Sequence, residues 1–78
     1  MEFIILPSAL KRSDMISFDD ILFVIATGDF IGTDTDGLVW WLGINPNGLG
    51  AEVAAAEGRD NLGALYVVHA MPMDWRKR

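Results

Sequence analysis

Turn-forming residues divide the chain after residue 28 into segments that are too short for ordinary helices. The turns are marked by Gly28, Asp36-Gly37, the run Asn45-Pro46-Asn47-Gly48 and the stretch 58–63. Asp-Gly is a strong hairpin dipeptide because glycine accepts the positive φ of a tight turn. The segments between the turns are apolar and of strand length, which predicts four consecutive antiparallel strands. We expect these strands over Asp29–Gly32, Leu38–Ile44, Leu49–Glu57 and Ala64–Met71.

One segment before these turns carries the start and stop signals of a helix. Ser17 stands at the N-cap with Asp20 three residues later, which is the spacing of a capping box. Ile16 and Ile21 occupy the two hydrophobic-staple positions, and Gly28 follows as the expected C′ residue. A strand over residues 21–25 is the competing prediction, since short apolar runs are ambiguous. The predicted core stripe is Phe18, Ile21, Leu22 and Ile25, with Phe23 and Val24 beside it.

The length of 78 residues supports one hydrophobic core and therefore a single domain, residues 1–78. The opening Phe3-Ile4-Ile5-Leu6 is apolar and stops at Pro7, which predicts a short strand or an extended arm. We therefore expect the α+β class. Its main helix packs on a four-stranded antiparallel meander, to which the N-terminal arm or short strand is added.

The predicted sheet carries apolar side chains on both faces, whereas one short helix covers only one face. The alternation places Leu38, Trp40, Leu42 and Ile44 opposite Val39 and Trp41, and Leu65, Val67 and His69 opposite Tyr66, Val68 and Ala70. Because 51% of the residues are hydrophobic and there is no cysteine for disulfides, association is the remaining support for the fold. A homodimer or a protein partner is expected, with Trp40 and Trp41 as interface anchors; interior packing of the pair is the alternative.

The charge distribution argues against a general nucleic-acid binder. The net charge is −5, and the stretch from Ser13 to Gly58 holds eight acids and no base. The bases are confined to Lys11, Arg12, Arg59, Arg76, Lys77 and Arg78. Polyanion binding therefore requires these bases to gather on one face of the fold, and the alternative is that they are simply solvated.

Several functional classes have no motif in this sequence. The absence of cysteine and the presence of one histidine leave no thiolate metal site, and no glycine-rich phosphate loop is present, so no metal or cofactor is expected. The turn around Asp34 and Asp36 lacks the later ligands of a calcium loop. The longest apolar run, residues 21–26, is far shorter than the roughly 20 residues of a membrane span. A cysteine-free chain suits the cytoplasm.

His69 is the only imidazole and hence the side chain best suited to proton transfer near neutral pH. It precedes the basic tail by a few residues. A histidine beside several cations can cleave RNA without a metal, since the base takes the proton of the ribose 2′-OH while cations stabilise the charge on phosphorus. The alternative is a structural histidine on an apolar strand.

Three stretches resemble small actinobacterial proteins related to the BrnT family of toxins, which are the ribonucleases of type II toxin–antitoxin pairs. They are Ser8-Ala9-Leu10-Lys11 with 16–21, the hairpin 42–53, and Val67-Val68-His69-Ala70-Met71-Pro72-Met73. The sequence departs from the family where Arg12 replaces a histidine and where Met71 replaces an arginine. Lys11 carries over unchanged.

The resemblance implies a toxin-like component that cleaves or binds RNA in the cytoplasm and is masked by an antitoxin-like partner. The candidate catalytic residues are His69 as general base or acid, with Lys11 and Arg76 as stabilisers of phosphate charge. Arg12, Lys77 and Arg78 are the candidate RNA contacts. A non-catalytic interaction module that dimerises through Trp40 and Trp41 is the alternative function.

Overall fold

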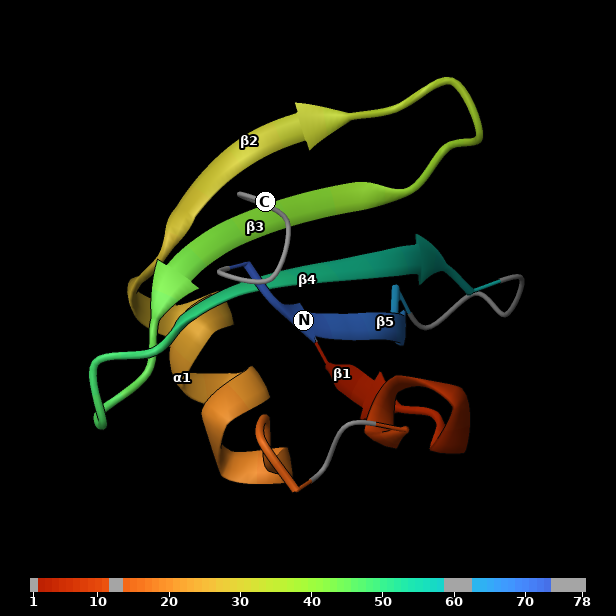
Figure 1. Cartoon of the computed structure of the whole chain (residues 1–78). Helices are drawn as coiled ribbons and strands as arrows, with labels where there is room; N and C mark the ends of the chain where they lie inside the picture. Colours follow the sequence, from red (N-terminus) through yellow and green to blue (C-terminus); the bar gives the residue numbers. More distant parts are fainter. Residues whose placement is uncertain (1, 12–13, 59–62, 74–78) are drawn as a thin grey trace.

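One main helix and five strands build the fold, so the α+β class is confirmed (Figure 1). The computed structural model describes residues 2–11, 14–58 and 63–73. None of the helices within these ranges has the length and apolar character needed to cross a membrane. The elements are β1 (Phe3–Ile5), the short 3₁₀ helix η1 (Pro7–Leu10), α1 (Phe18–Thr27), β2 (Asp29–Thr33), β3 (Val39–Ile44), β4 (Gly50–Glu57) and β5 (Leu65–Pro72).

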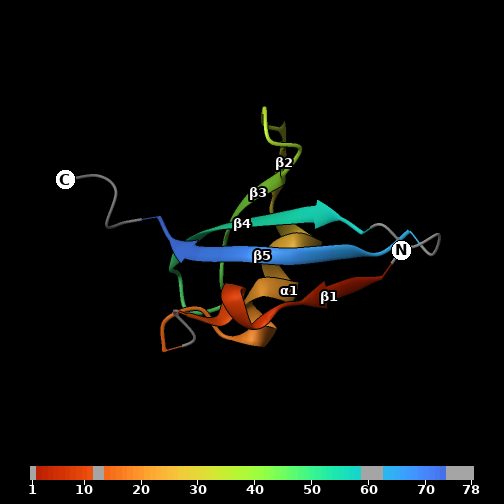
Figure 2. The same cartoon turned by 90° about the vertical axis from the view of Figure 1, so that its right-hand side faces the viewer.

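The sheet is mixed and five-stranded, in the order β1-β5-β4-β3-β2, which corrects the prediction of a four-stranded antiparallel sheet. The predicted meander accounts for β2 to β5, but β1 adds to the edge of β5 in parallel (Figure 2). Phe3 pairs with Leu65 and Ile5 with Val67. The last strand of a meander leaves one row of backbone groups unpaired, and the short apolar opening segment covers the first part of that row, over residues 65–67.

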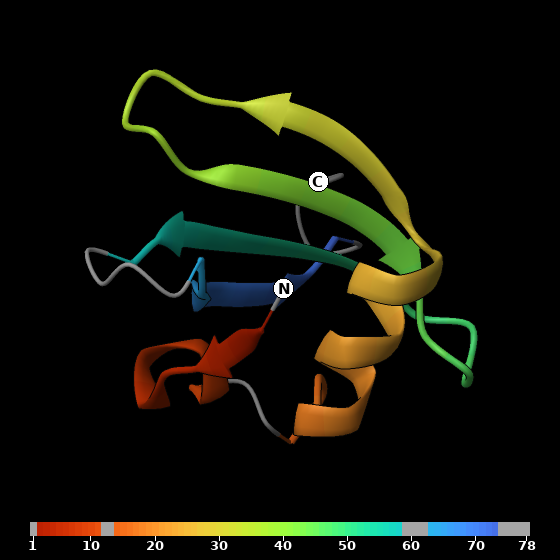
Figure 3. The same ribbon diagram turned by 180° about the vertical axis from the view of Figure 1, so that it is seen from behind.

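The helix begins at the predicted capping box. The Ser17 backbone N–H donates to Asp20 Oδ2 at 3.0 Å, and the Asp20 N–H donates to Ser17 Oγ at 3.2 Å. The helix lies across one face of the sheet (Figure 3). Its buried side chains are Ile21 and Val24, so the predicted stripe is wrong in part, because Phe18 and Leu22 are exposed.

Gly28 ends the helix for a different reason from the one expected. It lies at the C-cap with φ −80° and ψ 179°, which is extended and not left-handed. A Cβ atom at this position would meet both the Leu42 and the Val24 carbonyl oxygens at 2.6 Å. Gly43 faces the same junction, where its added Cβ would lie 3.1 Å from the Gly28 Cα. The two glycines therefore allow the end of α1 to approach β3 closely.

The two turns flanking β3 share one construction. Asp34 and Asn45 each use a side-chain oxygen to accept from backbone N–H groups two and four residues later. In each turn a glycine with positive φ closes the loop, Gly37 at 84° and Gly48 at 86°. Both turns were predicted from the sequence, and the Asp34 turn is confirmed as a hairpin connection.

The core lies between α1, η1 and one face of the sheet. Val53 at the centre of β4 is fully buried, with Ile21 and Val24 of the helix in the same cluster. Trp41 belongs to this cluster and is only 9% exposed. Its ring makes edge-to-face contacts with Phe3 at 5.9 Å and with Phe30 at 6.0 Å between centroids. Among the described residues no helix lies over the opposite face of the sheet, called here the open face (Figure 1).

Candidate functional site

A bulge in β5 determines the face on which His69 lies. Ala55 pairs with Val67 and Ala54 pairs with His69, so Val68 is the extra residue. An inserted residue reverses the alternation of side chains beyond it. The prediction that His69 shares a face with Val67 is therefore wrong: His69 points to the open face, and Ala70 takes the place in the core.

The open face carries a row of three residues across its central strands. Trp40 pairs with Ala54 in β4, and Ala54 pairs in turn with His69. Since cross-strand partners lie on the same face of a sheet, the two rings flank a single methyl group. They meet edge to face with their centroids 5.3 Å apart, and Ala54 is fully buried. The small residue in β4 thus permits the two rings to touch.

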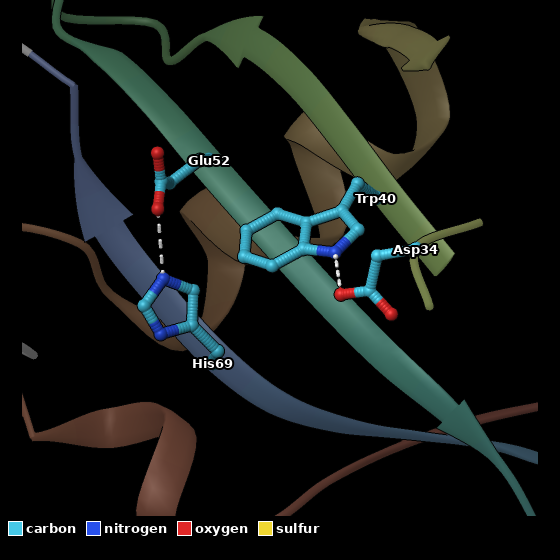
Figure 4. Close-up of polar contacts among 4 residues, drawn as sticks. All are labelled: Asp34, Trp40, Glu52 and His69. Atoms are coloured by element: carbon cyan, nitrogen blue, oxygen red, sulfur yellow. Dashed lines mark hydrogen bonds and ion pairs between the residues drawn. The ribbon is translucent and has the colours of Figure 1, made fainter. Parts of the chain in front are cut away.

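Glu52 holds the histidine ring from the same face. His69 Nε2 lies 2.9 Å from Glu52 Oε2, and the side chains are 31% and 7% exposed respectively. A carboxylate oxygen only accepts hydrogen bonds, so in neutral His69 the proton is on Nε2 and Nδ1 is the acceptor. Figure 4 shows Nδ1 turned away from both Glu52 and Trp40. The carboxylate therefore orients the ring and leaves one nitrogen available as a base.

Asp34 holds the other end of the Trp40 indole. The indole Nε1–H donates to Asp34 Oδ2 at 2.8 Å, so the ring lies between Asp34 on one side and His69 with Glu52 on the other (Figure 4). This hydrogen bond, followed by the one from the Leu38 backbone N–H, lowers the pKa of Asp34 below its usual value of 3.8. Asp34 is therefore ionised at neutral pH.

Two hollows flank His69. The larger, of about 580 Å³, includes two carboxylates and one indole; its lining residues are Ile31, Asp34, Trp40, Leu42, Glu52 and Met73. The smaller, of about 270 Å³, is lined by residues of β5 and by residues 8 and 11 near η1; its lining residues are Ser8, Lys11, Val68, His69, Ala70 and Met71. His69 thus contacts two residues of the first hollow, Trp40 and Glu52, and itself lines the second, which also includes Lys11.

The predicted site residues divide into three groups. His69 and Lys11 line the same hollow although they come from opposite ends of the chain. Trp40 and Trp41, for which interface anchors and interior packing were both predicted, lie on opposite faces of the sheet, and Trp41 is packed in the interior. The remaining predictions, Arg12, Arg76, Lys77 and Arg78, lie outside the described residues.

Three residues of this site were not predicted from the sequence as site residues. Glu52 had a visible signal, because it is the one charged side chain in the interior of an apolar, alanine-rich strand, whose other acid, Glu57, stands at its end. Asp34 was interpreted only as a turn residue, although its side chain both builds the turn and binds Trp40. Ala54 carried no individual signal, since its role depends on the register of two neighbouring strands.

No group of three potential metal ligands occurs in residues 2–11, 14–58 and 63–73. Comparison with known proteins adds no assignment: the chain matches no family model, no curated protein and no solved structure.

Proposed function

We propose that this chain is a toxin-like component of a type II toxin–antitoxin pair and cleaves RNA without a metal at His69. The observation that carries this proposal is the Glu52–His69 pair, at 2.9 Å, beside a hollow that Lys11 also lines. An imidazole oriented by a carboxylate, with a lysine lining the adjoining hollow, is a suitable set of groups for transfer of a phosphoryl group from one ribose oxygen to another.

In the proposed reaction, Nδ1 of His69 takes the proton of the ribose 2′-OH. The 2′-oxygen then forms a bond to phosphorus, and the bond from phosphorus to the 5′-oxygen of the next nucleotide breaks. The leaving 5′-oxygen takes up a proton from solvent, and His69 later releases its own proton to solvent, so the products are a 2′,3′-cyclic phosphate and a 5′-hydroxyl. Lys11 stabilises the negative charge on the phosphate oxygens, and Glu52 stabilises the imidazolium that forms.

The test is cleavage of a defined single-stranded RNA by the purified protein in the presence of a chelator. His69→Ala should abolish cleavage, and Glu52→Gln and Lys11→Ala should each reduce it about tenfold to a thousandfold. Lys11→Arg, which preserves the charge, is the matched control and should retain activity. Equal cleavage by the wild type and His69→Ala, or no cleavage by any variant, would remove the assigned roles.

The second candidate is a non-catalytic module that binds a protein through its exposed apolar side chains. Seven large apolar side chains of the described residues are exposed: Met15, Phe18, Leu22, Phe23, Phe30, Ile31 and Ile44. Exposed apolar surface of this kind marks interaction sites. Light scattering after size-exclusion chromatography, combined with the RNA assay, separates the candidates, since a dimer without RNA cleavage favours the module.

A further inference from the structure

The acidic hollow on the open face has a composition that is unsuited to RNA phosphate. Its lining contains the carboxylates of Asp34 and Glu52 and no basic side chain among the described residues. Apart from Met73, which follows β5, its lining residues come from β2 to β4 and the turn between β2 and β3, within the stretch of chain that holds eight acids and no base. Negative potential in a concave surface concentrates cations and repels anions.

An arginine side chain fits this hollow better than other cations. Asp34 bonds the indole edge of Trp40, and Glu52 stands beyond the opposite end of that ring (Figure 4). A guanidinium group can stack on an indole face while its N–H groups donate to carboxylates, whereas an ammonium group offers only a point charge. The apolar lining residues Ile31, Leu42 and Met73 suit the methylene stem of a long side chain.

A second copy of this chain is a poor occupant for the same hollow. In a two-fold symmetric dimer centred on this hollow the same patch meets itself, so the carboxylates of one copy would face those of the other. Like charges brought together across an interface disfavour association. The hollow therefore selects a different chain that carries positive charge.

We propose that this hollow binds an arginine side chain presented by a basic segment of a partner protein. This inference goes beyond RNA cleavage and does not depend on it. A segment bound there would lie beside Trp40 and Glu52, adjacent to His69, and would cover the open face. The partner is thus characterised by its chemistry: a basic stretch containing arginine and flanked by apolar residues.

The probe is a hexa-arginine peptide, titrated into the full-length protein and followed through the indole Nε1–H resonance of Trp40. That resonance is assigned by its loss in Trp40→Phe. The peptide should shift it in a saturable manner, hexa-lysine should bind more weakly, and hexa-glutamate should have no effect. Asp34→Asn should weaken hexa-arginine binding by about twofold to fivefold, which is the range of a solvent-exposed ion pair.

Asp36→Asn provides the matched control, since it removes one charge from the same turn without touching the hollow. The Asp34→Asn variant is expected to fold, because Asn45 supports a turn of the same construction with its own side-chain oxygen. Weaker binding in Asp34→Asn but not in Asp36→Asn would support the proposal. Equal weakening in both variants would mean nonspecific attraction and would overturn it.

Two other outcomes would also overturn the proposal. The first is failure of hexa-arginine to shift the Trp40 resonance, whether or not a single-stranded RNA hexamer shifts it. The second is a dimer, detected by light scattering, whose formation depends on Trp40. Since none of these measurements involves RNA cleavage, their failure is distinguishable from failure of the proposed reaction.

Discussion

The two faces of this sheet are built from the same strands but by different kinds of side chain. On the helix-covered face, Val53, Val67 and Trp41 belong to the core between the sheet, α1 and η1. On the open face, the small Ala54 side chain lies between Trp40 and His69 and allows their rings to touch. One face is thus stabilised mainly by buried apolar area, and the other presents polar groups fixed by specific contacts. The contrast shows how a small domain can separate its stability from its chemistry.

The adjacent tryptophans offer the sharpest test of this contrast. Trp41→Ala removes a buried ring from the core and should lower the free energy of unfolding by roughly 3–5 kcal/mol. Trp40→Ala removes a half-buried ring from the open face and should cost only about 1 kcal/mol. Urea denaturation followed by circular dichroism measures both. Equal losses would contradict the assignment of the two residues to different environments.

Two neighbouring positions of α1, one buried and one exposed, should show the same difference in their contribution to stability. Ile21→Ala creates a cavity in the core and should destabilise the domain by roughly 2–5 kcal/mol. Leu22→Ala is the matched control, because this side chain faces solvent, and the change should cost about 0.5 kcal/mol or less. Thermal unfolding of the two variants under one buffer condition gives the comparison. A larger loss for Leu22 would indicate that its face of the helix is covered in solution.

A larger side chain at position 54 tests whether the small Ala54 is what allows the Trp40 and His69 rings to touch. Ala54→Leu should separate the Trp40 and His69 rings and cost roughly 1–3 kcal/mol through overpacking. Loss of the ring-current shift on the His69 ring protons, measured by NMR, reports the separation. Ala56→Leu, on the same face and strand but away from the rings, should leave that shift in place.

The smallest expected effect concerns pH. The pKa of Asp34 is lower in the folded state than its usual value of 3.8, so ionisation of this carboxyl stabilises the fold. This stabilisation is fully present above pH 3.8, and it is lost as the pH falls through the lower, folded-state pKa. An NMR titration of the Asp34 carboxyl should give a pKa below 3.8, and the Trp40 indole N–H should shift with the same midpoint. In Trp40→Phe the Asp34 pKa should move back toward the usual value.

The local elements of the fold were predictable because their signals are local. Ser17 and Asp20 are close in the sequence and form the expected capping box, and both hairpin turns follow directly from their Asp or Asn and Gly residues. The strand boundaries differ from the prediction by one residue at most. Elements fixed by short-range chemistry can therefore be identified without knowledge of the tertiary structure.

The candidate site was predicted only in part because its geometry depends on long-range register. The bulge at Val68 has no glycine or proline to mark it, yet it reverses the orientation of His69. Sequence alternation alone therefore assigned the histidine to the wrong face. Glu52 and Ala54 acquire their roles only when β4 pairs with both neighbours, and the contact between Lys11 and the His69 hollow requires η1 to pack on β5.

The parallel pairing of β1 with β5 has a consequence for the order of assembly. Phe3 finds its partner, Leu65, only after the rest of the sheet has been synthesised, so the first-made strand is among the last to gain its backbone partners. Until then, the outer edge of β5 presents unsatisfied amides and carbonyls to any extended peptide nearby. During synthesis, this unpaired edge of β5 is therefore the part of the sheet where a chaperone could bind or where the β1 strand of another copy could pair.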